Sequence, residues 1–132
     1  EIIHYAVMQS KGERMPDGSE VMLIDSRTPD WTAKGMIPGA VNLPWTLLSE
    51  AKGADPISIA EIMTEQFGAK EQNGLFYFDD AKTLVMYCNG MWCGQSPNNI
   101  KSLLKYGYPA DKIKWFRGGM QTWEILGFNT VK

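Results

Sequence analysis

The chain has 132 residues, 44% of them hydrophobic and 21% charged, which is the size and balance of one globular domain. Thirteen basic residues against fifteen acidic residues leave a formal net charge of -2, so the chain has no excess of positive charge for binding nucleic acid. No apolar run approaches the length of a membrane span. We therefore expect a single domain over residues 1–132, with no nucleic acid as a partner and no membrane span.

Cysteine and histidine are scarce in this chain. The spacing of its two cysteines, Cys88 and Cys93, matches neither a zinc knuckle nor a CxxC redox pair. The one histidine, His4, is near the N-terminus and distant in sequence from every motif described below. The sequence therefore predicts neither a metal site nor a bound cofactor.

The first half of the chain predicts two strands and a helix after a mixed N-terminal segment. Residues 1–20 are expected to form an extension or a first element, followed by a core over residues 21–132. Val21–Asp25 is a continuous apolar run that ends in a charged residue, which is typical of a strand buried on both faces. Ser26–Lys34 is expected to contain a short helix, and Gly35–Pro44 a turn followed by a very short strand.

Helices and strands are expected to alternate in the second half as well. They are a helix over Ser58–Phe67, a strand over Leu84–Tyr87, a helix from Ser96, a strand over Ile113–Phe116 and a closing helix over Met120–Leu126. Ser58 and Ser96 are the predicted N-caps, because Glu61 completes a capping box with Ser58 and Pro97 follows Ser96. This alternation predicts an α/β fold with a mainly parallel sheet.

The segment that says most about chemistry is the strand that ends at Cys88, the loop after it and the helix start near Ser96. In parallel α/β sheets, ligands bind at the carboxyl ends of strands, where a helix start points its amides and positive dipole end. A cysteine held there is stabilised as a nucleophilic thiolate, and Gly90 and Gly94 let the backbone curl around the sulfur. The alternative is an inert thiol buried at a strand end. Local features leave both interpretations open.

Five short motifs follow one another from about Val21 to the C-terminal part of the chain. They are Asp25-Ser-Arg27, the stretch Gly35-Met-Ile-Pro-Gly-Ala40, the strand end Tyr87-Cys88, Leu104 to Tyr108 with the pattern L-x-x-x-G-Y, and Arg117-Gly-Gly-Met-Gln-Thr-Trp123. In this order they resemble the motifs of the single-domain rhodaneses, a sulfurtransferase family. Met36 stands where the family usually has histidine.

The resemblance implies a five-stranded, mainly parallel sheet with helices on both faces. It also implies an enzyme of the thiosulfate or thiol sulfurtransferase kind, in which Cys88 is catalytic and carries a persulfide sulfur. The sulfur would pass from a small donor to a thiol, another nucleophile or a protein acceptor. Asp25, Arg27 and Arg117 would support the site. The active-site loop would consist of Asn89, Gly90, Met91, Trp92, Cys93, Gly94 and Gln95.

This loop departs from the common family pattern, because it is longer, contains no lysine or arginine, and has a second cysteine. A dianion such as thiosulfate would gain no side-chain charge from it, whereas Met91 and Trp92 would give an apolar entrance suited to an organic thiol or a protein. Cys93 is open to three interpretations: a bystander, a resolving thiol that attacks modified Cys88, or half of a structural disulfide.

Two other functions compete with sulfur transfer. A cysteine phosphatase would need an arginine that closes a C-x5-R loop, and no arginine lies between Cys88 and Arg117. A non-catalytic rhodanese module would keep Cys88 and Cys93 for protein binding or redox sensing. Because the sequence starts at Glu1 without an initiator methionine, we expect a bacterial protein of the periplasm, with the cytoplasm as the alternative.

Overall fold

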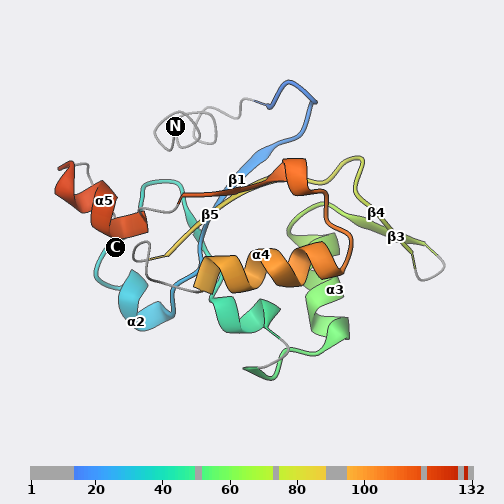
Figure 1. Ribbon diagram of the computed structural model, residues 1–132, viewed down its shortest axis with the longest axis horizontal. Coiled ribbons are helices and arrows are strands. Elements are labelled where there is room, and N and C mark those ends of the chain that lie inside the picture. Colours follow the sequence, from blue (N-terminus) through green and yellow to red (C-terminus); the bar gives the residue numbers. More distant parts are fainter. Residues whose placement is uncertain are drawn as a thin grey trace.

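A four-stranded parallel sheet organises the protein, as Figure 1 shows for the computed structural model. Its strands are β1 (Val21–Asp25), β2 (Val41–Asn42), β5 (Thr83–Tyr87) and β6 (Ile113–Trp115), in the spatial order β2-β1-β5-β6. The structure describes residues 14–49, 52–72, 75–88, 95–116, 119–127 and 130. The two central strands pair along their whole length, with Asp25 opposite Tyr87. The carboxyl ends of β1 and β5 therefore meet at one edge of the sheet.

Helices cover both faces of this sheet. The remaining elements are α2 (Pro29–Thr32), η1 (Trp45–Leu48), α3 (Pro56–Glu65), the antiparallel hairpin β3 (Lys70–Gln72) and β4 (Leu75–Tyr77), α4 (Gln95–Lys105), η3 (Ala110–Lys112) and α5 (Gly119–Ile125). None of the helices in the described part of the chain is long and apolar enough to cross a membrane.

Two hydrophobic clusters hold the layers together. Met22, Ile24, Leu84 and Met86 on one face of the sheet pack with residues of α3 and α4 such as Leu103. Alternate residues of the same strands face the other way and pack with Met120 and Trp123 of α5. All ten residues of β1 and β5 are buried, because successive side chains of a strand point to opposite faces and both faces are covered. The buried runs predicted from the sequence are thus the central strands.

The predicted α/β architecture is confirmed, with one difference in the strand count. The described residues contribute four strands to the parallel sheet, not five, together with the β3–β4 hairpin that the sequence did not predict. The closing helix is confirmed, and Trp123 lies on its buried side with 6% of its surface exposed. A turn before β1 is closed by an antiparallel bridge between Arg14 and Glu20.

The N-caps predicted for the second half of the chain, Ser58 and Ser96, are both wrong. In α3 the cap is Asp55, whose side chain accepts a hydrogen bond from the amide of Ser58, so Ser58 lies inside the helix. Pro56 occupies the first helical position, where its missing N–H costs nothing. The fourth helix begins at Gln95, which places Ser96 inside it as well.

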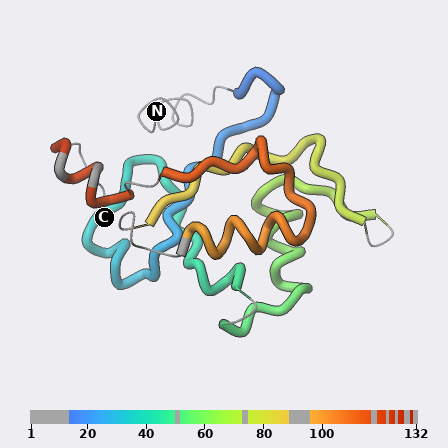
Figure 2. The backbone as a smooth tube through the Cα atoms, in the orientation of Figure 1, coloured from blue at the N-terminus to red at the C-terminus, as the bar shows by residue number. Residues whose placement is uncertain are grey.

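The molecule has two ends along the direction of the parallel strands. In the backbone trace of Figure 2, α2 and α5 lie on the side to which the carboxyl end of β5 points, and the β3–β4 hairpin projects on the opposite side. Groups near the hairpin are therefore remote from the residue that follows β5.

Candidate functional site

Cys88 directly follows the central strand β5 and its backbone is held on two sides. The amide of Ser26, the residue after β1, donates to the carbonyl of Tyr87 at 2.9 Å and extends the sheet pairing to the residue before Cys88. The amide of Met120, in the first turn of α5, donates to the carbonyl of Cys88 at 2.9 Å. Cys88 carries a thiol, and 1% of the residue's surface is exposed. The position of the thiol is thus set by the sheet and by α5.

The start of α4 is fixed to the same edge by a pair of serines. The Ser96 hydroxyl donates to the Ser26 hydroxyl at 3.1 Å, and both residues are fully buried although 70 positions separate them. Ser96 therefore anchors the first turn of α4 to the loop after β1 instead of capping the helix. The anchor brings the N-terminal end of α4 to the edge at which Cys88 lies.

Asp25 and Arg27 form a buried ion pair beside this edge. The guanidinium Nη2 donates to Asp25 Oδ2 at 2.7 Å, and Nε donates to Oδ1 at 2.9 Å. The same Nη2 also donates to the carbonyl of Gly35 at 2.7 Å. Gly35 has a φ of +135°, a conformation that glycine adopts without strain. The pair holds the turn after α2 against the end of β1.

Burial and the Asp25 charge both affect the pKa values of neighbouring side chains. Burial would lower the pKa of Arg27, but the hydrogen bond and the negative charge of Asp25 outweigh it and raise the pKa. Burial raises the pKa of Tyr87, and the charge of Asp25 raises it further, so the phenol is neutral at physiological pH. Its oxygen accepts a hydrogen bond from the amide of Ile37 at 3.2 Å.

Two residues that the sequence did not single out also shape this edge. The Ser26 hydroxyl accepts the hydrogen bond from Ser96 of α4. The Asn42 side-chain amide donates to the carbonyls of Asp25 and Arg27 at 3.1 and 2.8 Å. Their positions, directly after β1 and at the end of β2, are the signal that was available. Polar residues at the carboxyl ends of neighbouring parallel strands share one edge.

Several predicted site residues lie outside the described part of the chain. They are Asn89, Gly90, Met91, Trp92, Cys93, Gly94 and Arg117, whereas Gln95 is the first residue of α4.

Two lysines lie on the segments that follow β1 and β2. Lys34 Nζ is 4.7 Å from the centroid of the Trp31 ring, and Lys52 Nζ is 5.6 Å from the centroid of the Trp45 ring.

Asn99 is an unusual residue in α4. It is fully buried and lies on the same helix face as Ser96 and Leu103, three and four positions away. Neither atom of its side-chain amide has a hydrogen-bond partner among the described residues. Among those residues there is also no group of three or more His, Cys, Asp or Glu side chains placed to hold a metal ion.

A parallel sheet with helices on both faces, and a cysteine at the carboxyl end of a central strand, define the class of α/β proteins that bind or react at the strand ends. A model of the rhodanese-like domain matches residues 9–126, and the chain therefore belongs to the rhodanese-like domain family.

Individual proteins are similar to this chain in sequence or in fold. A sulfurtransferase of Allochromatium vinosum is 29% identical over 123 residues, which cover 93% of this chain and 90% of that protein. The BH2092 protein of Bacillus halodurans has a similar fold, with a TM-score of 0.62 at 17% identity over 98% of this chain and 73% of its own. A human single-domain sulfurtransferase superposes with a TM-score of 0.54 at 19% identity, over 94% of this chain and 92% of its own. The family and the first relative support a sulfurtransferase-family role.

Proposed function

We propose that this protein is a sulfurtransferase that carries sulfane sulfur as a persulfide on Cys88. The observation that supports the proposal most is the position of Cys88, which directly follows β5 between the first turn of α5 and the anchored start of α4. The dipole of α4 and the amides of its first turn favour negative charge at this edge, which is the charge of a thiolate or a persulfide.

The reaction has two displacement steps. The Cys88 thiolate attacks the outer sulfur of the donor, a sulfur–sulfur bond forms at Cys88, and the donor's own bond breaks with the electron pair leaving on the donor fragment. An acceptor thiolate then attacks the outer sulfur of the Cys88 persulfide, and Cys88 leaves as the thiolate. The two steps balance without any oxidant or reductant. Asp25 and Arg27 would act as positioning residues, because their side chains bond to each other and to the backbone.

The acceptor we propose is an organic thiol or a protein thiol. The loop from Asn89 to Gln95 has no cationic side chain, and the guanidinium of Arg27 is already bonded to Asp25. A small dianion would therefore gain little charge stabilisation from the side chains of the loop or from Arg27. Met91 and Trp92 would instead offer apolar surface to a larger acceptor.

The second candidate is a module that binds a partner or senses redox state through Cys88 and Cys93 without turnover. The cationless loop is the observation that favours it. Steady-state transfer to a thiol acceptor separates the two. We expect repeated turnover by the wild-type protein, background activity for Cys88→Ser and most of the activity for Cys93→Ser. A single stoichiometric reaction without turnover would favour the module, and full activity of Cys88→Ser would contradict the assignment of Cys88.

A bacterial origin and a periplasmic location stay predictions. Fractionation of cells that express the full-length gene product tests the location, because recovery in the cytoplasmic fraction would contradict it.

A further inference from the structure

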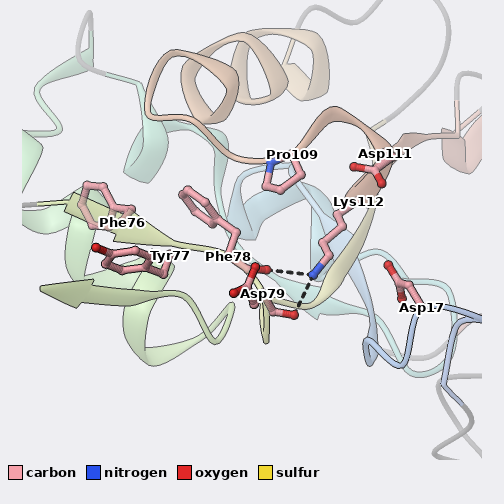
Figure 3. A pocket seen from close by; sticks show the side chains of 8 residues that line it. All are labelled: Asp17, Phe76, Tyr77, Phe78, Asp79, Pro109, Asp111 and Lys112. Atoms are coloured by element: carbon pink, nitrogen blue, oxygen red, sulfur yellow. Dashed lines mark hydrogen bonds between the residues drawn. The ribbon is translucent and has the colours of Figure 1, made fainter.

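A second concave region lies at the end of the molecule opposite Cys88. It is an open cavity of about 530 Å³ between β4 and η3, shown in Figure 3, and this volume is in the range of small-ligand sites. Two kinds of side chain dominate its wall: the aromatic run Phe76–Phe78 and the carboxylates of Asp17, Asp79 and Asp111. Lys112 is the one cation among the described residues that line it.

The ammonium group of Lys112 is hydrogen-bonded within the protein. Its ammonium group donates to the carbonyls of Phe78, Asp79 and Ala81 at 2.8, 3.2 and 3.1 Å, and 8% of the residue's surface is exposed. An ammonium has three donors, so these three carbonyls satisfy it. The lysine thus ties η3 to the turn after β4 and has no hydrogen left for an anionic ligand.

The carboxylates carry a surplus of negative charge. Asp17, Asp79 and Asp111 are all exposed, and together with Lys112 they give the described residues of the cavity wall a formal charge of -2. The hydrogen bonds of Asp17 with the hydroxyl and amide of Ser19 lower its pKa, so this carboxylate stays ionised well below neutral pH. No hydrogen bond joins the Asp79 or Asp111 carboxylates to another side chain in the described part of the chain.

The aromatic wall is preorganised and partly open. The Phe78 ring packs against Tyr108 with centroids 5.0 Å apart, and against Phe76 with centroids 6.2 Å apart. Tyr77 is 46% exposed, and together with Asp79 it also lines a neighbouring cavity of about 200 Å³. Tyr77 ends β4 and Asp79 lies in the turn after it, and both line this cavity, so that a phenol ring and a carboxylate are available to one planar cation.

We propose that this cavity binds the guanidinium group of an arginine on a partner polypeptide. A guanidinium is planar, stacks on aromatic rings and pairs with carboxylates through a fork of N–H groups, whereas an ammonium is a compact, strongly hydrated charge. The negative wall excludes an anionic ligand, and the aromatic rings favour a cation that can be partly desolvated. The site is independent of sulfur transfer at Cys88, because the hairpin and the carboxyl end of β5 lie on opposite sides of the molecule (Figure 2).

An NMR titration with a short peptide tests the proposal. The probe is a capped Gly-Arg-Gly peptide, and the reference is the same peptide with citrulline, which has the shape of arginine without its charge. We expect saturable shifts of the amides of residues 76–79 and 110–112 with the arginine peptide only. Equal shifts with the citrulline peptide, or shifts confined to other residues, would overturn the proposal.

Two variants give the matched comparison. Asp79→Asn is expected to weaken binding of the arginine peptide at least about threefold, the effect of one partly exposed charge pair. Glu65→Gln removes the same charge from an exposed position of α3 and is expected to leave binding unchanged. If Glu65→Gln weakened binding as much as Asp79→Asn, the effect would be one of net charge and the site would be rejected. Sulfur loading of Cys88 is expected to be unchanged in both variants.

Discussion

The ion pair of Asp25 and Arg27 sets the path of the chain around the end of β1. Asp25 is fully buried and Arg27 is 2% exposed, so each charge depends on the other for compensation. The pair also supplies the donor for the carbonyl of Gly35. The pair therefore fixes the backbone of the turn after α2 against the end of β1.

Removing the cation alone should therefore be costly. Arg27→Met leaves the Asp25 carboxylate buried without its partner, and we expect the free energy of unfolding to fall by about 3–5 kcal/mol. Urea denaturation measures this loss. The double variant Asp25→Asn/Arg27→Met should lose less than the sum of the two single variants, because the pair acts as a unit. Additive losses would contradict the interpretation of the pair as coupled.

Asn99 presents the opposite situation, a buried side-chain amide with no hydrogen-bond partner among the described residues. Burial removes water from its donor and its acceptor, and no described residue replaces that water. We expect Asn99→Leu, which has a similar volume, to raise the free energy of unfolding by about 1–3 kcal/mol. The same denaturation experiment measures the gain. A loss of stability would mean that the amide has a partner in the folded protein.

At the scale of elements, the cap of α3 belongs to Asp55. We expect Asp55→Ala to lower the melting temperature, because the Ser58 amide then loses its acceptor, and Ser58→Ala to have little effect. The hydrogen bond from Ser58 lowers the pKa of Asp55, so this stabilisation is present above the ordinary carboxyl pKa and is lost as the pH falls through the lowered value. Asp55→Asn keeps an acceptor and should lose that pH dependence. A larger effect of Ser58→Ala than of Asp55→Ala would restore Ser58 as the cap.

The errors in the predicted elements have physical causes. Ser58 with Glu61 fits a capping box, but Asp55-Pro56 fits the start of a helix equally well and lies three residues earlier. The hairpin was not predicted because β3 is fully exposed and Leu75 and Tyr77 of β4 are exposed as well, so the alternation that identifies a half-buried strand is missing. The fully buried strands β1 and β5 gave the strongest pattern, and their prediction is confirmed.

At the scale of the whole molecule, the parallel sheet creates the site by joining distant segments. The motif Asp25-Ser-Arg27 could be predicted to lie at the edge occupied by Cys88, since both follow buried strands. The contact between Ser26 and Ser96 could not, because it spans 70 residues and depends on how α4 packs on the sheet. The family model confirms the rhodanese-like assignment that the motifs suggested. The roles of individual residues in the loop after Cys88 stay predictions.

The central claim is that Cys88 accepts sulfane sulfur, and peptide mass spectrometry tests it most directly. Wild-type protein and the Cys93→Ser variant are exposed in turn to thiosulfate and to a low-molecular-weight persulfide, and then to a thiol acceptor. We predict that the peptide containing Cys88 gains the mass of one sulfur atom from at least one donor, in both proteins, and that the acceptor removes it. Folded protein that gains no sulfur on Cys88 from either donor, or gains it on Cys93 alone, would contradict the account.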